Sequence, residues 1–483
     1  MIETGNASNR TLILVAVLLV MTMIAIEATI VATAMPRIAG ELGGIDLYSW
    51  VFSSFLLAQT ATTLVFGKLA DIFGRRRLIL SGLSLFSLGS LACGFAPSMP
   101  LLIVCRVLQG IGAGAMHPVS VTVIGDLYPG AERGKVQGYL ASVWAVASVS
   151  GPLIGGLLLQ HLGWGWVFWI NLPLCALAAG CFTIYLEEVR SDALIPVDWL
   201  GALLLIASVI AIMVAISTTA SSVLLAAVLG CVGSVCAIAF IRRNRNAHDP
   251  ILDFQMLTRP VIAICNLGTA MASAVMMGLT GFLPIYVQSV LGQTPTTAGF
   301  ALTAMLFSWP ISATFAARNL VRFGIKPLYV TGGALLPVGG AILLCLRPRM
   351  SPFVAGSASL IIGAGLGLLN TIAIIVVQAS AEHRKRGAAT AANLFARNLG
   401  GTIGMASFGA LLSLGIKERP GLSMGTVHDL LTGNVTFTDT DSLRAALGDD
   451  LWNIFFAILL ICFLTALATM FLPSGLDQRP IEQ

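Results

Sequence analysis

The feature that most constrains this chain is a series of long apolar stretches that recurs along almost its whole length. The hydrocarbon core of a bilayer is about 30 Å thick, and an α-helix crosses it with about 20 apolar residues. Fourteen such stretches lie at residues 11–36, 48–70, 78–97, 100–125, 137–159, 165–186, 199–217, 221–241, 261–284, 296–317, 328–346, 352–378, 388–414 and 451–472. Only 10% of the residues are charged, against about 25% in a soluble domain. The sequence therefore predicts an all-α integral membrane protein with 14 transmembrane helices, and excludes a soluble enzyme, a nucleic-acid-binding protein and a disordered chain.

Basic residues are distributed unevenly between the two sides of the predicted membrane. An even number of spans puts both termini on one side, and 19 of the 27 Lys and Arg residues fall there, with six on the other side. Because basic loops stay in the cytoplasm, we expect both termini to be cytoplasmic and the protein to lie in a bacterial cytoplasmic (inner) membrane. The first stretch has no small-residue cleavage site after it, which is typical of a retained span. The longest loop, 415–450, is expected outside, as a loop or short hairpin.

The sequence also contains an internal repeat. Residues 66–78 have a weaker echo at 316–328, in which Gly74 aligns with Gly324. Two parallel repeats in one chain are a transporter architecture, with the substrate site at the midplane between them. We therefore expect a six-helix bundle at 1–190, two inserted transmembrane helices with a linker at 191–260, and a second six-helix bundle at 261–483.

A tight basic turn fills the predicted loop between the second and third spans. Gly74 is expected to adopt a positive φ, which glycine tolerates. Asp71 can accept hydrogen bonds from an arginine or from a helix N-terminus, and Arg133 in the next cytoplasmic loop is a candidate partner. Such a latch would hold one access state and break in the other; the alternative is that the basic residues only anchor the topology. The predicted latch residues are Gly67, Lys68, Asp71, Gly74, Arg75, Arg76 and Arg133.

With this turn the sequence resembles the major facilitator superfamily, whose loop motif residues 67–76 match in full. It is similar, more narrowly, to the fourteen-span drug:proton antiporter group of multidrug efflux transporters. The group usually has Asp where Glu27 stands, and often Arg where Gly165 stands. The resemblance implies the major facilitator fold, with two six-helix repeats plus two inserted central helices, and proton antiport without a cofactor. The other segments that carry it are 27–36, 106–114, 151–156, 168–173, 283–288 and 397–401.

Glu27 is the only acidic residue well inside a predicted span. A charged carboxylate at depth costs at least about 3 kcal/mol, so it must be paired, hydrated or protonated. At 1.5 Å per residue, Glu27 and Arg106 lie about 13 and 9 Å from the outer face, which is compatible with a pair. We expect these two residues to couple transport to protons; a static ion pair, or direct capture of a cationic substrate by Glu27, are the alternatives.

Three other groups inside the spans have two interpretations each. The predicted fifth span contains Gly151, Pro152, Gly155 and Gly156, which can pack closely and bend; the resemblance associates this segment with antiport, and close packing alone is the alternative. His117 can relay a proton or serve as a hydrogen-bonding group between helices. Arg397, near the cytoplasmic start of its span, can extend to the membrane surface or have a role inside the span.

A substrate cavity between the halves is expected to be apolar and aromatic with few polar groups, as in promiscuous pockets. Candidate substrate-binding residues are Met23, Trp144, Asn266, Met276, Met277, Phe282, Tyr286, Gln288, Asn370 and Asn393. The nine cysteines lie in apolar stretches without the spacing of a metal site, so no metal and no cofactor other than the coupling proton is expected. The expected partners are small lipophilic substrates and membrane lipids, without nucleic acid, and the expected state is a monomer.

These features predict a proton-coupled secondary antiporter that exports lipophilic, often cationic, drugs or toxic compounds by alternating access. One alternative is a dedicated exporter of a single metabolite, lipid or siderophore. Another is a membrane sensor that does not transport, which the combination of Glu27 with the glycines of the fifth span argues against. An enzyme is disfavoured because no His, Cys or acidic cluster lies near a membrane face.

Overall fold

Long α-helices make up nearly all of the computed structural model. It describes residues 7–42, 47–128, 130–187, 198–218, 222–246, 250, 253–293, 295–348, 350–382, 385–418 and 440–473. The first half contains α1 (Ala7–Leu42), α2 (Tyr48–Phe73), α3 (Arg75–Gly94), α4 (Met99–Leu127), α5 (Gly130–His161), α6 (Trp166–Trp169) and α7 (Asn171–Tyr185). Between the halves lie α8 (Trp199–Thr218), α9 (Val223–Asn246) and α10 (Phe254–Leu257). The second half contains α11 (Pro260–Ile285), the π-helix η2 (Tyr286–Val290), α12 (Pro295–Phe323), α13 (Ile325–Leu344), α14 (Pro352–Ser380), α15 (Arg386–Glu418) and α17 (Thr440–Met470).

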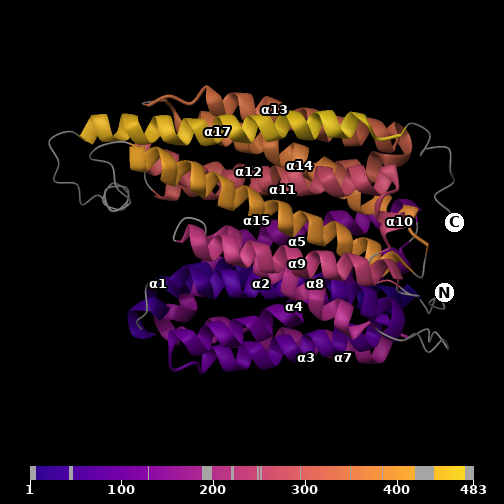
Figure 1. Cartoon of the computed structure of the whole chain (residues 1–483). Helices are drawn as coiled ribbons and strands as arrows, with labels where there is room; N and C mark the ends of the chain where they lie inside the picture. The colour runs from indigo at the N-terminus through magenta and orange to yellow at the C-terminus, as the bar shows by residue number, and fades with distance from the viewer. Residues whose placement is uncertain are drawn as a thin grey trace.

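The packing of the first half is repeated in the second. Helix α4 packs against α2 and α3, and α1 packs against α5 and α7; in the same way α14 packs against α12 and α13, and α11 against α15 and α17. Figure 1 shows α3 and α7 at one edge of the bundle and α13 and α17 at the opposite edge, with α1 beginning and α17 ending on the same side. The two halves meet where α2 contacts α15 and where α5 contacts α12.

The turns at the centre of the internal repeat have matching backbones. Gly74 separates α2 from α3 with φ of 93°, and Gly324 separates α12 from α13 with φ of 80°. Both angles lie where side chains other than hydrogen are disfavoured. The positive φ expected at Gly74 is confirmed, and its repetition at Gly324 agrees with the weak sequence echo.

Twelve helical segments among the described residues are long and apolar enough to cross a membrane. The inserted pair, α8 and α9, is among them, and α6 with α7 forms one span. The expected count of fourteen is not confirmed, because α5 and α15, of 32 and 33 residues, are not among the twelve.

Both predicted bounds of the outer loop, 415 and 450, are wrong. Helix α15 continues to Glu418, and α17 already begins at Thr440. Leu447 is fully buried, so the first turns of α17 pack against the bundle before its apolar stretch starts. Residues 419–439 lie outside the described part of the chain.

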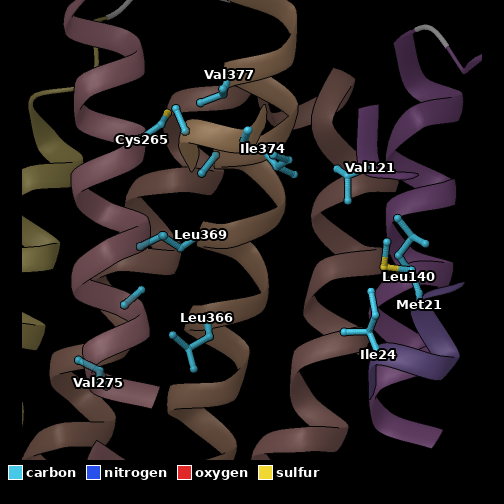
Figure 2. Packing of buried hydrophobic residues seen from close by; sticks show 14 of the residues in the cluster. Met21, Ile24, Val121, Leu140, Cys265, Val275, Leu366, Leu369, Ile374 and Val377 are labelled. Atoms are coloured by element: carbon cyan, nitrogen blue, oxygen red, sulfur yellow. The ribbon is translucent and has the colours of Figure 1, made fainter. Parts of the chain in front are cut away.

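Buried apolar side chains form a core that runs through both halves. Figure 2 shows Met21 and Ile24 of α1 near Leu140 of α5, and Leu366 and Leu369 of α14 near α11. All of these side chains belong to one continuous cluster. Apolar packing therefore holds the helices of each half together.

We expect Gly74→Ala to destabilise the protein by about 2 kcal/mol, because a Cβ at this backbone conformation is strained. The measurement is thermal unfolding of the purified protein in detergent. Gly180→Ala is the matched control, since nothing lies within 4 Å of a Cβ at this helical position and alanine favours helix. Equal unfolding temperatures for Gly74→Ala and the unaltered protein would contradict the expectation.

Candidate functional site

A buried ion pair joins α1 to α4 in the first half. Glu27 of α1 is 0% exposed and Arg106 of α4 is 2% exposed, and Arg106 Nη1 donates a hydrogen bond to Glu27 Oε1. Asn171, the first residue of α7, donates from Nδ2 to Glu27 Oε2 over 2.6 Å. The guanidinium of Arg106 also lies 4.3 Å from the ring centroid of Phe55 on α2. The pair predicted from depth is therefore formed, and it lies inside the first bundle.

Neutral polar groups complete the surroundings of the pair. Arg106 Nη1 donates to Gln109 Oε1 over 2.6 Å, and Arg106 Nε donates to the carbonyl of Val51 on α2 over 3.1 Å. Gln109 Nε2 donates to Ser90 Oγ over 3.2 Å, and this hydroxyl donates to the carbonyl of Phe168 over 2.8 Å. Each of these hydrogen bonds satisfies a polar group whose burial without a partner would cost free energy. The bonds therefore fix the positions of these side chains.

Sequence reasoning did not assign three residues of this group: Ser90, Gln109 and Asn171. Two of them stand inside segments that carried the family resemblance, Gln109 in 106–114 and Asn171 in 168–173. The sequence signal that could have identified Gln109 and Asn171 was a neutral amide near a charge inside the membrane. Asn171 reaches Glu27 because the helix breaks between α6 and α7; Pro173, which has no N–H, cannot continue the α6 hydrogen bonds to Trp169.

A second polar network joins the two halves at the end of the bundle where α4 ends and α15 begins. Asp71 of α2 accepts hydrogen bonds from the backbone N–H groups of Gly387 (3.2 Å) and Ala388 (2.9 Å) in the first turn of α15. Arg75 pairs with the same carboxylate over 3.0 Å. A carboxylate at a helix N-terminus is stabilised by the unpaired N–H groups and by the helix dipole.

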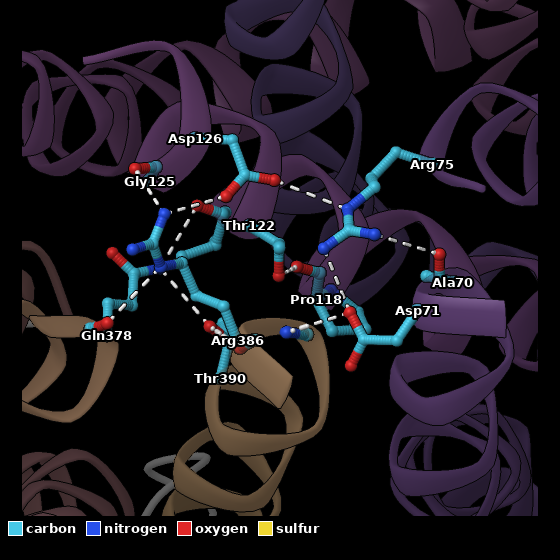
Figure 3. A network of polar contacts seen from close by, with 12 residues as sticks. Ala70, Asp71, Arg75, Pro118, Thr122, Gly125, Asp126, Gln378, Arg386 and Thr390 are labelled. Carbon is cyan, nitrogen blue, oxygen red and sulfur yellow. Dashed lines mark hydrogen bonds and ion pairs between the residues drawn. The ribbon is translucent and has the colours of Figure 1, made fainter. Parts of the chain in front are cut away.

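Asp126, at the end of α4, extends this network. Its two oxygens pair with Arg386 of α15 over 2.9 Å and with Arg75 over 3.3 Å. Arg386 also donates to the carbonyls of Gln378 (3.3 Å) and Gly125 (3.4 Å). Figure 3 shows the two carboxylates and two guanidiniums alternating between residues of α2, α3, α4 and α15. Of its members, only Asp71 and Arg75 were predicted; Asp126 and Arg386 were not.

The remaining latch residues have different surroundings. Gly67 lies against α15, where a Cβ would stand 2.2 Å from that of Ala391. Arg76 Nη2 donates to the carbonyl of Thr183 over 2.5 Å and so joins α3 to α7. Lys68 is half-buried. The side chain of Arg133 lies outside the described part of the chain, so its expected pairing with Asp71 stays a prediction.

Glu27 is not the only buried acid among the described residues, although it is the only one placed well inside a predicted span. Asp71 and Asp126, whose side chains are 5% and 1% exposed, are buried near the ends of α2 and α4, and Asp450 is buried in α17. Each stands just beyond a predicted span, where the sequence alone suggests water. The other half of the bundle covers the first two carboxylates instead.

Part of the fifth-helix motif packs against α1. A Cβ on Gly151 would lie 1.9 Å from Thr29 Oγ1, whereas a Cβ on Gly156 would meet nothing within 4 Å. Helix α5 continues through Pro152 and Gly155 to His161. Close approach at Gly151 is thus a feature of the structure, and the gating role stays a prediction.

The candidate substrate-binding residues do not gather in one place. Asn393 Nδ2 donates to Asn266 Oδ1 over 2.9 Å, which joins α15 to α11. Met23 contacts Cys175 inside the first bundle, Phe282 packs edge-on against Phe408, and Tyr286 packs against Phe455. Trp144 is 37% exposed, Asn370 donates to its own helix at Leu366, and Met276, Met277 and Gln288 are half-buried. Only Asn266 and Asn393 are brought together by a direct contact that the structure describes.

The linker after the inserted helices is tied to the start of α15. Asp253 accepts from the Met256 N–H over 3.1 Å and pairs with Lys385 over 2.7 Å. Burial raises the pKa of Asp253, but the hydrogen bonds from Lys385 and Met256 outweigh it and leave the pKa below its ordinary value. Among the described residues, no group of three His, Cys, Asp or Glu is placed to hold a metal.

Comparison with known proteins settles the family. A profile of the Major Facilitator Superfamily matches residues 17–405. The chain belongs to this superfamily. It is therefore an integral membrane protein of a transporter family, not an enzyme.

The multidrug transporter protein MdtP of Bacillus subtilis is 34% identical over 86% of this chain and 77% of its own length. Multidrug resistance protein 3 of the same organism is 32% identical over 84% of this chain and 80% of its own length. Among solved structures, the proton:xylose symporter XylE superposes with a TM-score of 0.64 at 15% identity, covering 97% of each chain. The last likeness concerns the fold alone.

We expect Arg106→Leu to destabilise the protein by about 3–5 kcal/mol, because it leaves Glu27 as an unpaired buried carboxylate. Thermal unfolding in detergent measures the effect. The double variant Glu27→Gln/Arg106→Leu, which removes both charges, should recover most of the loss. A double variant that is less stable than Arg106→Leu would contradict this account.

We expect Asp71→Ala to speed amide hydrogen exchange in the first turn of α15, because the N–H groups of Gly387 and Ala388 lose their acceptor. Hydrogen exchange followed by mass spectrometry measures this. Asp198→Ala, which removes the separate pair with Arg243, is the control and should leave α15 unchanged. Unaltered exchange of α15 in Asp71→Ala would rule out the contact as a stabiliser of this helix end.

Proposed function

We propose that this protein is a proton-coupled antiporter that exports lipophilic compounds from a bacterial cell by alternating access. Two relatives at 34% and 32% identity are a multidrug transporter and a multidrug resistance protein, which supports the export of varied compounds. The observation that carries the coupling proposal is the Glu27 carboxylate, which is fully buried in the first bundle and paired with Arg106.

We also propose that α5 and α15 cross the membrane, which gives fourteen spans. Both helices pack among the twelve apolar segments, α5 against α1 and α12, and α15 against α2 and α11. Residues 1–190 and 261–483 would then move as two bundles, with 191–260 as inserted helices and linker. Both termini and the network of Asp71 and Asp126 would face the cytoplasm, in line with the excess of basic residues on that side.

Protonation of Glu27 would mainly alter the charge balance inside the first bundle. Protonation removes the charge that balances Arg106 and leaves a buried guanidinium without a counter-ion. Arg106 is bonded to Val51 of α2, so the change extends to α2. The full burial of Glu27 argues against direct capture of a cationic substrate by this residue.

Helix α2 also carries Asp71, which is bonded to α15 of the other half. We propose that this network keeps the cytoplasmic end closed in the state described, and that its opening accompanies protonation or deprotonation of Glu27. Helix α2 touches both sites, through the Val51 carbonyl and through Asp71, so each site can bias the same two-state equilibrium. Exchange between the two states would carry protons inward and substrate outward.

We expect Glu27→Gln to abolish substrate-stimulated proton movement while the protein stays folded, because the amide cannot release a proton. The measurement is the response of an entrapped pH-sensitive dye in proteoliposomes, screened across lipophilic dyes and quaternary ammonium compounds. Glu41→Gln is the matched control, since Glu41 lies on the same helix in an exposed pair with Arg37. Proton movement at the level of the unaltered protein in Glu27→Gln would refute the coupling role.

A further inference from the structure

The intramembrane charges of the described chain do not balance. Two arginines, Arg106 and Arg397, stand within predicted spans, and Arg106 is balanced by Glu27. Arg397 forms no ion pair or hydrogen bond with any residue that the structure describes. An arginine at bilayer depth costs at least about 2.5–3.5 kcal/mol, and such residues mark binding sites or ion pathways.

Arg397 lies on α15, which packs against α2 and α4 of the first half. Its charge is close enough to His117 of α4, which is 6% exposed, to interact with it electrostatically. Because Asp126 and Arg386 are paired, the end of α4 and the start of α15 lie at one level. Arg397 is then about 16 Å along α15 from this level and His117 about 14 Å along α4, at 1.5 Å per residue. The two residues therefore lie at similar depths on neighbouring helices.

This position favours a role inside the bundle over the snorkelling considered for Arg397, in which the side chain follows the lipid-facing surface to the headgroups. A buried histidine lies at a similar depth on the neighbouring α4. His117 likewise has no hydrogen bond to any described residue, so the structure does not show the helix–helix hydrogen bond considered for it. Two nitrogen-bearing side chains thus interact without an acid among the described residues.

The residues around this pair suit a lipophilic anion. One turn before Arg397, Asn393 provides an amide bonded to Asn266 and Thr269. One turn after it, Met277 of α11 lies against Gly401, where a Cβ would stand 3.1 Å from the methionine Cγ. Methionine adapts to varied apolar shapes. A charged group at Arg397 would therefore have neutral polar groups on one side and an apolar surface on the other.

We propose that Arg397 and His117 form a subsite for the anionic group, a carboxylate or sulfonate, of a lipophilic substrate. This inference rests on the proposed export function and specifies its substrate class. Arg397 supplies a planar guanidinium that binds a carboxylate through two parallel hydrogen bonds, and His117 supplies a further donor. The substrate anion completes the charge balance that Glu27 provides for Arg106.

The test compares naphthalene ligands whose single substituent is anionic, neutral or cationic. Purified protein in detergent is titrated with 2-naphthoate, 1-naphthalenesulfonate, the neutral 2-naphthamide and the cationic 2-naphthylmethylammonium, and the affinities are taken from the shift in unfolding temperature. We expect both anions to bind at least about tenfold more tightly than the amide, the factor typical of a charge-assisted hydrogen bond. Equal affinities, or no stabilisation by either anion, would overturn the proposal.

Variants locate the effect. Arg397→Gln should bind the anions and the amide equally, Arg397→Lys should keep part of the preference, and Arg242→Gln, at an exposed arginine of α9, should keep all of it. His117→Leu should weaken anion binding by a smaller factor, and full binding would remove His117 from the site. Arg397→Gln that retains the anion preference would overturn the proposal.

Stability without ligand gives a second readout. Because Arg397 has no described partner, Arg397→Gln should unfold at the same temperature as the unaltered protein or higher; a large decrease would reveal a structural ion pair instead and overturn the proposal. The binding assay needs no proton gradient. If the anion preference is absent while substrate-stimulated proton movement persists, only this inference fails; if proton movement is absent while the preference persists, only the proposed coupling fails.

Discussion

The ion pair between Glu27 and Arg106 is the interaction on which the organisation of the first bundle depends. A bilayer offers almost no compensation for a lone charge, so both groups must meet, and their hydrogen-bond partners must stand at fixed places around them. The partners come from α2, α3, α4 and α7. Four helices that apolar packing alone would hold in many similar registers are thereby given one register.

A second polar network fixes the two halves relative to each other, as the ion pair fixes the helices of the first bundle. Its members are Asp71, Arg75, Asp126 and Arg386. It combines backbone N–H groups at the start of α15 with three ion pairs between two carboxylates and two guanidiniums. When the two halves separate, water can satisfy the helix N-terminus. The ion pair lies within one bundle, whereas the network joins the two halves. This contrast supports the proposal that the first site holds the proton and the second reports the access state.

Much of the fold could be predicted because hydropathy, the positive loops and the 250-residue echo are local patterns. The turn at Gly74 and the pairing of Glu27 with Arg106 followed from residue type and depth. The sequence could not assign Asp126 and Arg386, because their partners belong to helices 260 residues apart. It also placed Asp450 outside a span and extended the loop 415–450 too far, since burial by a neighbouring helix leaves no mark on local hydropathy. The scattered positions of Met23, Phe282 and Tyr286 have the same origin: side-chain direction on an apolar helix is decided by packing.

The two halves share their helix packing but differ in where their intramembrane charges lie. The offset of 250 residues places Met277 where the first half has Glu27, and Gly356 where it has Arg106, so the second bundle has the same helix packing without the buried pair. Its intramembrane arginine, Arg397, interacts electrostatically with His117 of the first bundle. Duplicated scaffolds that differ in this way allow different roles, since the packing that both halves share does not depend on either charge. A proton site enclosed within one half and a ligand site between the halves can then be altered separately, while the closing network at the cytoplasmic end remains common to both.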